Sequence, residues 1–378
     1  MKVVKLALLL SLAWSVSVCD AQQTPPDAAA ARIAGGEQWR TDFSKHSVPL
    51  EEIVSGGPPK DGIPAIDQPR FESLREADRW LEDRDPVMVV EHGDQAKAYP
   101  LAILIWHEIV NDVVGGLPVA ATFCPLCNTA LVFDRRVDDR LFDFGTTGRL
   151  RHSDLVMYDR QTETWWQQAT GEAIVGELTG TKLEFVPQTT LAWKTARETY
   201  PNLEVLSRNT GHVRDYGHNP YVGYDDRNNS PILRFFRGDT DPRLPAMQRM
   251  VAIDAAEGWA VSIETLRSER VVNAEIGRTP VVVFWQGGAA SALDRSDISQ
   301  GRDVGQTATF DRRLSDRTLT FRGAEGGFQD RETGSRWDLA GRAVEGPLRG
   351  QRLRAVPHGN HFWFAWIVFR PDTELWSP

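Results

Sequence analysis

With 378 residues, 41% of them hydrophobic and 25% charged, the chain has the size and composition of a folded globular protein with room for two domains, which excludes a disordered or fibrous protein. The formal net charge of −9 argues against binding to nucleic acid or to an anionic membrane, because both need clustered Lys and Arg. Beyond the N-terminal residues, no stretch is long and apolar enough to predict a transmembrane segment.

The N-terminus has the pattern of an export signal. A positively charged start is followed by a short apolar run, Leu6–Val18, and small residues precede a cleavage position after Ala21. Residues 1–21 are therefore predicted to be a signal peptide, with lipidation of Cys19 as the second interpretation. The mature protein is then periplasmic or extracellular. Residues 22–45, rich in Gln, Pro and Ala, are predicted to be a flexible linker.

Internal repeats organise the rest of the chain. Matched Gly, Pro, Trp and apolar residues recur at a nearly constant offset in three pairs of segments: 98–111 and 260–273, 159–166 and 330–337, and 176–187 and 346–357. This recurrence predicts a first copy over residues 46–208 and a second over residues 246–378. Residues 209–245 interrupt the repeat, and their Tyr and His content predicts an ordered bridging loop.

Each copy has the same predicted order of elements. In the first copy this is a hairpin over 87–99, a helix over 101–110, strands at 119–123 and 130–133, and a last helix over 190–199. Short strands separated by Gly turns, with few helices, predict a β-rich α+β fold. We expect the two tandem copies to pack with pseudo-twofold symmetry.

The repeat also separates shared residues from residues confined to one copy. Asp159, Arg160 and Trp166 recur in the second copy, so a structural role is expected for them. Three residues of metal-binding types are confined to the first copy: His107, Cys124 and Cys127. The second copy has non-matching residues at these positions: Glu269, Gln286 and Ala289. Their joint loss predicts one Cys2His metal site, with copper as the first choice and zinc as the second.

Other His and Met residues are weaker candidates for the same site. Met157 could be a soft axial ligand, although Phe328 at the matching position favours a core role. His152 and His212 are further possible ligands. His358 and His361 have a metal-like spacing but are predicted to be a surface pair.

The bridging loop carries a run of polar and aromatic residues. Its candidates for lining the open side of the site are Arg214, Tyr216, His218 and Tyr221. The same residues could instead dock the two copies against each other, and the sequence favours neither interpretation.

Two other functions compete with metal binding. Cys124 and Cys127, separated by two residues, could form the redox pair of a thiol-disulfide oxidoreductase, or a structural disulfide. The chain could also be a non-catalytic binding scaffold that uses the bridging loop. No nucleophile elbow, P-loop or dinucleotide fingerprint is present in the sequence.

Four strings in the sequence resemble a known family: Trp106–Asp112, Phe123–Ala130, Leu155–Thr162 and Phe362–Trp366. Together they are similar to the exported bacterial and archaeal proteins grouped as domain of unknown function 3179. The resemblance covers residue 60 to the C-terminus and implies no particular activity. His358 and His361 depart from the small or polar residues usual in that family before the last string.

Overall fold

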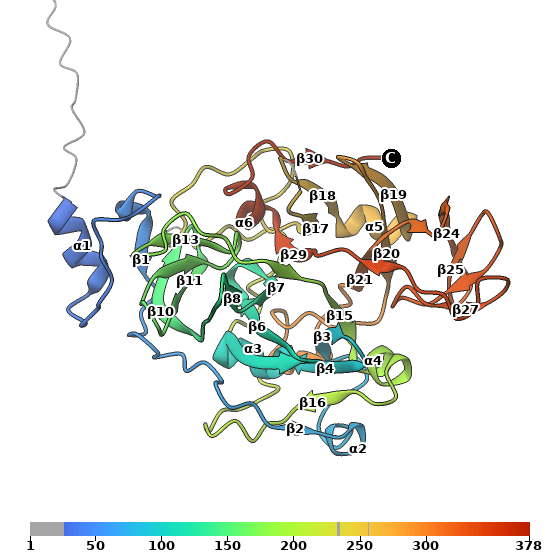
Figure 1. The fold of residues 1–378 in the computed structure, drawn as a ribbon, viewed down its shortest axis with the longest axis horizontal. Helices are drawn as coiled ribbons and strands as arrows, with labels where there is room; N and C mark the ends of the chain where they lie inside the picture. The colour runs from blue at the N-terminus through green and yellow to red at the C-terminus, as the bar shows by residue number, and fades with distance from the viewer. Residues whose placement is uncertain (1–25, 233–234, 256) are drawn as a thin grey trace, which may run out of the picture.

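The computed structural model describes residues 26–232, 235–255 and 257–378. The predicted signal peptide and Cys19 lie outside the described residues. The described chain is rich in strands and has few helices, which confirms the expected α+β class (Figure 1). The α-helices are α1 (Pro26–Ala34), α2 (Leu74–Ala77), α3 (Leu101–His107), α4 (Trp193–Thr199), α5 (Ile263–Glu269) and α6 (Trp363–Ile367).

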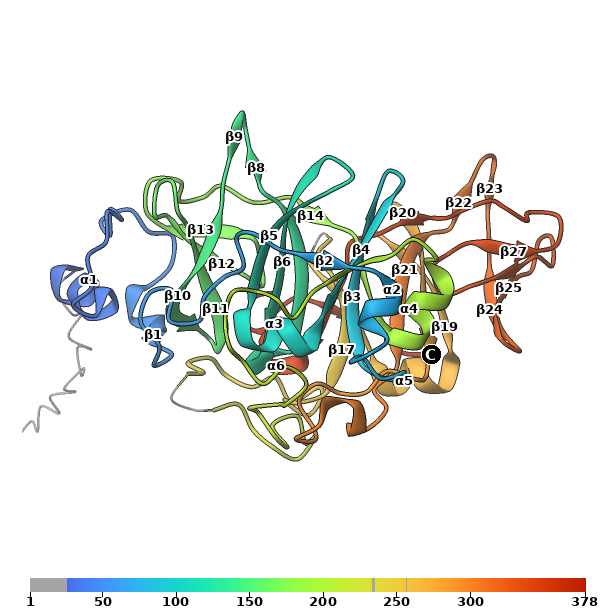
Figure 2. The same ribbon diagram turned by 90° about the horizontal axis from the view of Figure 1, so that it is seen from below.

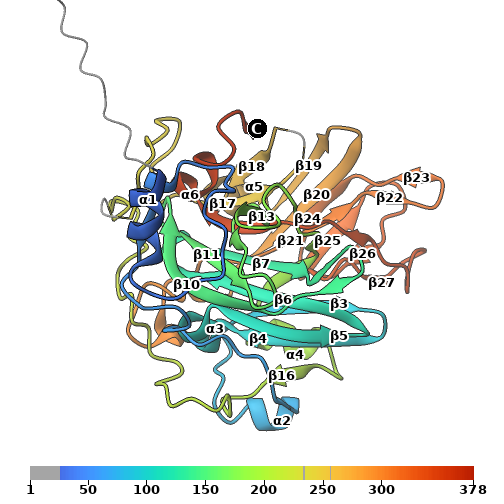
Figure 3. The ribbon, with the colours of Figure 1, turned by 60° about the vertical axis from the view of Figure 1, so that its left-hand side comes forward.

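Two sheets formed by the first half lie side by side (Figures 1 and 3). The first has the order β1-β10-β11-β12-β13. Its strands are β1 (Ile53–Ser55), β10 (Phe144–Arg151), β11 (Asp154–Asp159), β12 (Trp165–Gln167) and β13 (Glu172–Val175). The second has the order β14-β7-β6-β5. Its strands are β14 (Phe185–Val186), β7 (Thr129–Asp134), β6 (Leu117–Cys124) and β5 (Ile109–Val114).

The largest sheet joins strands of both halves. Its main path is β19-β20-β21-β15-β3-β4-β16-β2, and β28 pairs with β21. The strands from the second half are β19 (Val271–Ile276), β20 (Thr279–Gln286), β21 (Gln306–Asp311) and β28 (Arg354–Ala355). Those from the first half are β15 (Gln188–Ala192), β3 (Pro86–His92), β4 (Gln95–Pro100), β16 (Glu204–Leu206) and β2 (Phe71–Glu72). The two halves therefore share main-chain hydrogen bonds.

The remaining strands belong mainly to the second half. One sheet has the order β29-β17-β18-β30, formed by Gly359–Phe362, Arg249–Ile253, Trp259–Ser262 and Glu374–Leu375. Another has the order β24-β25-β26-β27, formed by Phe321–Ala324, Gly327–Asp330, Arg336–Trp337 and Ala343–Glu345. Two small hairpins are β8-β9 (Arg136–Val137, Arg140–Leu141) and β22-β23 (Arg313–Leu314, Arg317–Thr318).

Strand order and local hydrogen bonds recur between the halves. The path β15-β3-β4-β16 of the first half matches β29-β17-β18-β30 of the second, and the last pair is parallel in both. Asp159 accepts hydrogen bonds from the Trp166 indole (3.0 Å) and the Thr162 backbone (2.6 Å). Asp330 accepts the same bonds from Trp337 (2.9 Å) and Thr333 (2.6 Å). The tandem duplication and its pseudo-twofold symmetry stay predictions, with which these recurrences agree.

Removal of either aspartate should destabilise the protein by a similar amount. Asp159→Ala and Asp330→Ala each leave an indole N–H and a backbone N–H in the interior without an acceptor, at a cost of roughly 1–3 kcal/mol per variant. Urea denaturation of the two variants and the wild type measures this cost. A large cost at only one position would contradict equivalent roles for the two aspartates.

Two predicted elements differ from the structure. The helix expected over 101–110 ends at His107, because Glu108 adopts a φ of 60° and the chain continues as β5. Within the expected flexible linker, residues 26–34 form α1, and Ala29 and Ile33 are buried against the first half. The four consecutive alanines favour a helix, and Ile33 supplies the apolar contact that anchors it.

The bridging loop contacts a segment that the second half inserts between β20 and β21. Asn219 and Gly223 of the loop donate backbone hydrogen bonds to the carbonyls of Ser296 and Asp294 (both 2.8 Å). Figure 2 shows the two segments together on the side of the molecule where α3 and α6 lie. In the first half, the same position between strands is occupied by the short cysteine loop.

Across the described ranges, no helix is both long and apolar enough to cross a membrane.

Candidate metal centre

The two cysteines lie in a short loop that joins neighbouring strands. β6 ends at Cys124, a 3-10 turn covers Pro125–Cys127, and β7 begins at Thr129. Asn128 has a φ of 51°, a left-handed conformation that Asn tolerates better than most residues. It turns the chain back so that Thr129 pairs with Cys124. Both cysteines are buried as free thiols on this one loop.

Asp154, the first residue of β11, is the third member of the centre. His152 and Ser153 precede it with φ values of 51° and 70°, the two positive values that a tight hairpin turn between β10 and β11 requires. Oδ2 of Asp154 accepts hydrogen bonds from the Ala169 backbone (2.8 Å) and the Gln167 amide (2.5 Å). Oδ1 is buried and accepts no hydrogen bond from a nitrogen or oxygen donor of the described chain, while the Cys127 thiol interacts with the same carboxyl group.

These elements bring three ligand atoms together. The sulfurs of Cys124 and Cys127 and one carboxylate oxygen of Asp154 all lie within 4.8 Å of one another, and all three residues are buried. Cys124 Sγ also approaches the Ser153 carbonyl oxygen at 3.7 Å. Two thiols and one carboxylate in this arrangement are a ligand set that zinc and other transition metals bind.

Glu108 adds a second buried carboxyl close to the cluster. Its positive φ lies at the end of α3, where its carbonyl oxygen accepts a hydrogen bond from the Phe123 backbone (2.8 Å), next to Cys124. Burial, with a smaller contribution from the Asp154 carboxylate, raises the pKa of Glu108 to about 8. The matching residue of the second half, Arg270, has the same backbone conformation but the opposite charge.

The centre holds acidic groups without a basic partner. Burial raises the pKa of Asp154 to about 7, and it raises the pKa values of the Cys124 and Cys127 thiols above their usual range. No Lys, Arg or His of the described chain forms an ion pair with Asp154 or Glu108. Removing several acidic groups from water in one place is costly unless protons or a cation neutralise them.

The structure does not bring His107 to the sulfurs. Its Nδ1 lies 2.7 Å from the Pro64 carbonyl oxygen and its Nε2 lies 2.7 Å from the Tyr216 hydroxyl, so both ring nitrogens have partners. Its nitrogens are not in the group of ligand atoms formed by the cysteines and Asp154. The chain reverses at Glu108, directly after α3. The Glu108 side chain therefore lies near Cys124, whereas the His107 ring lies against Pro64 and Tyr216. The predicted Cys2His convergence is corrected to two cysteines and an aspartate.

The other proposed ligands also lie outside this group. Met157 is buried in the core opposite Trp166. The His152 ring lies 3.1 Å from the Glu52 carboxylate through Nε2 and packs against aromatic rings. His212 is exposed, and its ring is tilted by 48° against that of His107, with 5.4 Å between the centroids.

The bridging loop both covers the centre and docks the halves. Tyr224 donates a hydrogen bond to the Leu126 carbonyl (2.9 Å), and burial, with the nearby Glu108 and Cys124 groups, raises the pKa of Tyr221. Tyr216 contacts His107 instead, and the His218 ring bonds to Ser296 in the second half (2.9 Å). Arg214 is partly exposed and bonds only to the neighbouring Val213 carbonyl.

An arginine from the second half supports the cysteine loop. Arg249 donates to the Asn128 side-chain oxygen (2.6 Å), and it also contacts Asp225 (2.6 Å) and Ser291 (2.7 Å). Arg302 forms a second ion pair with Asp225 (2.8 Å). The turn that orients the sulfurs is thus held by a charged network from outside the first half.

His358 and His361, predicted to be a surface pair, are both buried, with 4% and 1% of their surfaces exposed. His361 lies in β29, and its Nδ1 is 2.9 Å from the hydroxyl of Thr129 in β7. The prediction failed because the contact between β29 and β7 joins residues far apart in the sequence.

The family resemblance is confirmed over most of the chain. The sequence pattern of a family described as a protein of unknown function, DUF3179, matches residues 60–373. The chain belongs to this family. No curated protein and no solved structure is similar to this DUF3179 protein.

Sequence reasoning missed Asp154 and Glu108, although the comparison of the two halves contains a signal for each. Glu108 matches Arg270, a change of charge at a shared backbone position. The hairpin that carries Asp154 pairs Phe144 with Asp159 at its base, whereas the second-half hairpin is shorter. The residues near the turn of the first-half hairpin, which include Asp154, therefore have no equivalent in the second half. This is expected of residues with a function specific to the first half.

Proposed function

We propose that this protein is an exported metal-binding protein that holds one zinc ion through Cys124, Cys127 and Asp154. The observation that carries the proposal is the environment of the Oδ1 atom of Asp154. This atom is buried without a nitrogen or oxygen donor, and the carboxylate lies in one cluster with two buried thiols, of which Cys127 interacts with it directly. A cation at this point is a partner for this oxygen and neutralises the acidic groups.

The ligand types favour zinc over copper. Cuprous copper prefers thiolate and thioether ligands, and the methionine considered for it, Met157, is not in the cluster. Zinc accepts thiolate and carboxylate oxygen together, and its double charge matches a centre with more than one acidic group. Glu108 lies outside the group of ligand atoms, and its buried carboxyl would act as an acceptor for a water bound to the metal.

A thiol-disulfide oxidoreductase is the second candidate, favoured by the proximity of the two free thiols. Burial opposes it, because it raises the pKa of each thiol, whereas catalytic cysteines are accessible and have lowered pKa values. A role as a binding scaffold does not account for the clustering of two buried thiols with the Asp154 carboxylate.

Metal titration of two variants tests the ligand set. The wild type, purified under reducing conditions and stripped of metal, should bind one zinc per chain in competition with a chromophoric chelator. Asp154→Asn should weaken binding by at least about 10–100-fold, the loss typical even of residues behind the ligands. His107→Gln should bind zinc like the wild type. Bound cobalt should give a thiolate charge-transfer absorption that Cys124→Ser weakens.

Two outcomes would contradict this proposal. One is a wild-type protein that binds no stoichiometric zinc or cobalt. The other is equal loss of affinity in His107→Gln and Asp154→Asn, which would restore the imidazole as a ligand. Reversible oxidation of the two thiols to a disulfide in the folded protein, detected as alkylation that occurs only after mild reduction, would favour the oxidoreductase instead.

A further inference from the structure

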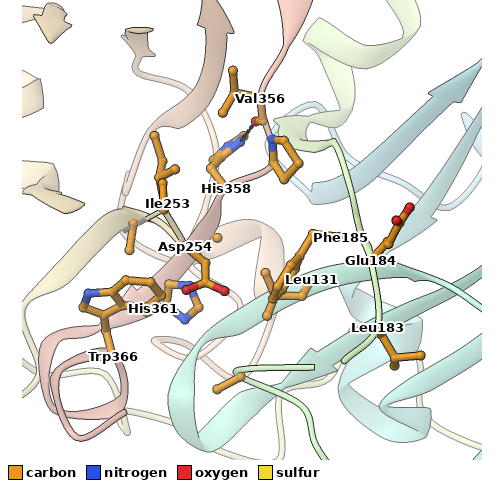
Figure 4. Close-up of a pocket in the computed structure, with 15 residues that line it drawn as sticks. Leu131, Leu183, Glu184, Phe185, Ile253, Asp254, Val356, His358, His361 and Trp366 are labelled. Carbon is orange, nitrogen blue, oxygen red and sulfur yellow. Dashed lines mark hydrogen bonds between the residues drawn. The ribbon is translucent and has the colours of Figure 1, made fainter. Parts of the chain in front are cut away.

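A cavity of about 390 Å³ lies between the two halves, and none of the cysteine-centre residues lines it. Its side chains come from β7, β14, β17, β29 and α6, together with the connecting segments (Figure 4). The apolar walls include Leu131, Phe185, Ile253 and Trp366, and the polar groups include Asp254, His358 and His361. The volume is at the small end of ligand pockets.

His361 presents a free ring nitrogen in this cavity. The Thr129 hydroxyl donates to the Cys127 carbonyl (3.3 Å), so it accepts the hydrogen bond from Nδ1 of His361 (2.9 Å). The proton of the neutral ring is then on Nδ1, and Nε2 carries a lone pair. Within the described chain, Nε2 has no hydrogen-bond partner, although 99% of the residue is buried.

His358, three residues earlier in the chain, repeats this arrangement. Its Nδ1 lies 3.0 Å from the Thr309 hydroxyl, which itself donates to the Val356 carbonyl (2.5 Å). Nδ1 of His358 is therefore the donor, and its Nε2 is buried without a partner in the described chain. Figure 4 shows His361 beside Asp254 and Trp366, with His358 near Val356.

The buried groups around the two histidines carry no unbalanced charge. Both oxygens of Asp254 have partners, since Arg370 donates to Oδ1 and Lys182 to Oδ2, each at 2.7 Å. Burial lowers the pKa of His358 to about 4 and that of His361 to about 3, so both rings are neutral at neutral pH. An anion would meet no free positive charge here. Glu184 also lines the cavity, but its side chain is exposed, and Figure 4 shows its carboxylate turned away from His361.

We propose that this cavity binds a small uncharged phenol, whose ring packs against Trp366 and Phe185 and whose hydroxyl donates to the free Nε2 of His361. The apolar walls take up the ring, because burial of an aromatic surface is favourable. The hydroxyl supplies the donor that the buried imidazole lacks, which removes the cost of an unpaired acceptor. This site is independent of the zinc proposal.

Calorimetric titration with 4-ethylphenol and its methyl ether, 4-ethylanisole, tests the assignment on the full chain. The two probes have nearly the same shape, but the ether has no donor. We expect the phenol to bind roughly 3–10-fold more tightly than the ether, the range that one net hydrogen bond provides. His361→Phe should remove this preference. The control His46→Phe, at an exposed histidine, should keep it.

A second variant keeps the test valid if His361→Phe does not fold. Ala255 lines the cavity and is partly exposed, so Ala255→Trp should fill the cavity with little strain and abolish binding of both probes. The proposal is overturned if 4-ethylphenol does not bind at its solubility limit. Equal affinities for phenol and ether, or unchanged binding in Ala255→Trp, would overturn it as well.

Discussion

Replacing Cys124 and Cys127 together by serine should abolish the stabilisation of the protein by zinc. A ligand that binds only the folded state, at a free concentration about 1,000 times its Kd, adds about 4 kcal/mol to the free energy of unfolding. The wild type should therefore gain several degrees in Tm when zinc is added to the metal-free protein. The double variant should show no change, because the serine hydroxyls do not replace thiolates as ligands.

Differential scanning calorimetry with and without a chelator measures this difference. Met157→Leu is the matched control, because Met157 is equally buried nearby and lies outside the ligand group. It should keep the full response to zinc. The zinc-dependent gain should shrink as the pH falls below neutrality, since protons compete with zinc for thiols whose pKa values burial raises. An equal gain in the double variant would place the metal elsewhere.

Lys97→Met should destabilise the protein by about 3–5 kcal/mol, because it removes one partner of a buried ion pair. The Lys97 ammonium lies 3.0 Å from both carboxylate oxygens of Asp112 and 2.9 Å from the Val113 carbonyl. Tyr99 donates a further hydrogen bond to Asp112 (2.7 Å). Without the ammonium, the carboxylate remains in a low-dielectric interior, where only the tyrosine still satisfies it.

The double variant Lys97→Met/Asp112→Leu separates this charge effect from lost packing. It should recover a large part of the stability, since replacing both ions by apolar groups removes the unpaired charge. Urea unfolding followed by circular dichroism gives the three free energies. A loss below 1 kcal/mol in Lys97→Met would show that water reaches the carboxylate. Far-UV spectra of the folded variants should match the wild type.

The sequence predicted local elements well because their signals are local. The apolar run Val87–Val90 and the turn signal at Gly93 and Asp94 predicted the hairpin over 87–99, which forms β3 and β4. The predicted strand at 119–123 lies within β6, and the predicted helix over 190–199 contains α4. The pairing of β15 with β21 was not predictable, since Thr190 and Thr307 are brought together only by the tertiary fold.

The candidate site was predicted in part. The comparison of the two copies identified Cys124 and Cys127, because cysteine at both positions is confined to one copy. The same comparison did not identify the role of His107 correctly. This residue is also confined to the first copy, but its ring contacts Pro64 and Tyr216 and not the two sulfurs. Asp154 contributes through a hairpin turn whose length differs between the halves, and a fixed alignment offset does not reveal such a residue.

The hydrogen bond from Arg249 to Asn128 makes the geometry of the cysteine loop dependent on the second half of the chain. A fragment that ends before the bridging loop would retain every proposed ligand and yet lack the guanidinium that fixes the turn between them. Its thiols would sample many orientations, and ordering them would reduce the affinity for metal. The second half, which supplies no ligand, thus fixes the turn that holds the ligands of the first half. Metal binding by the first half therefore depends on the presence of the second.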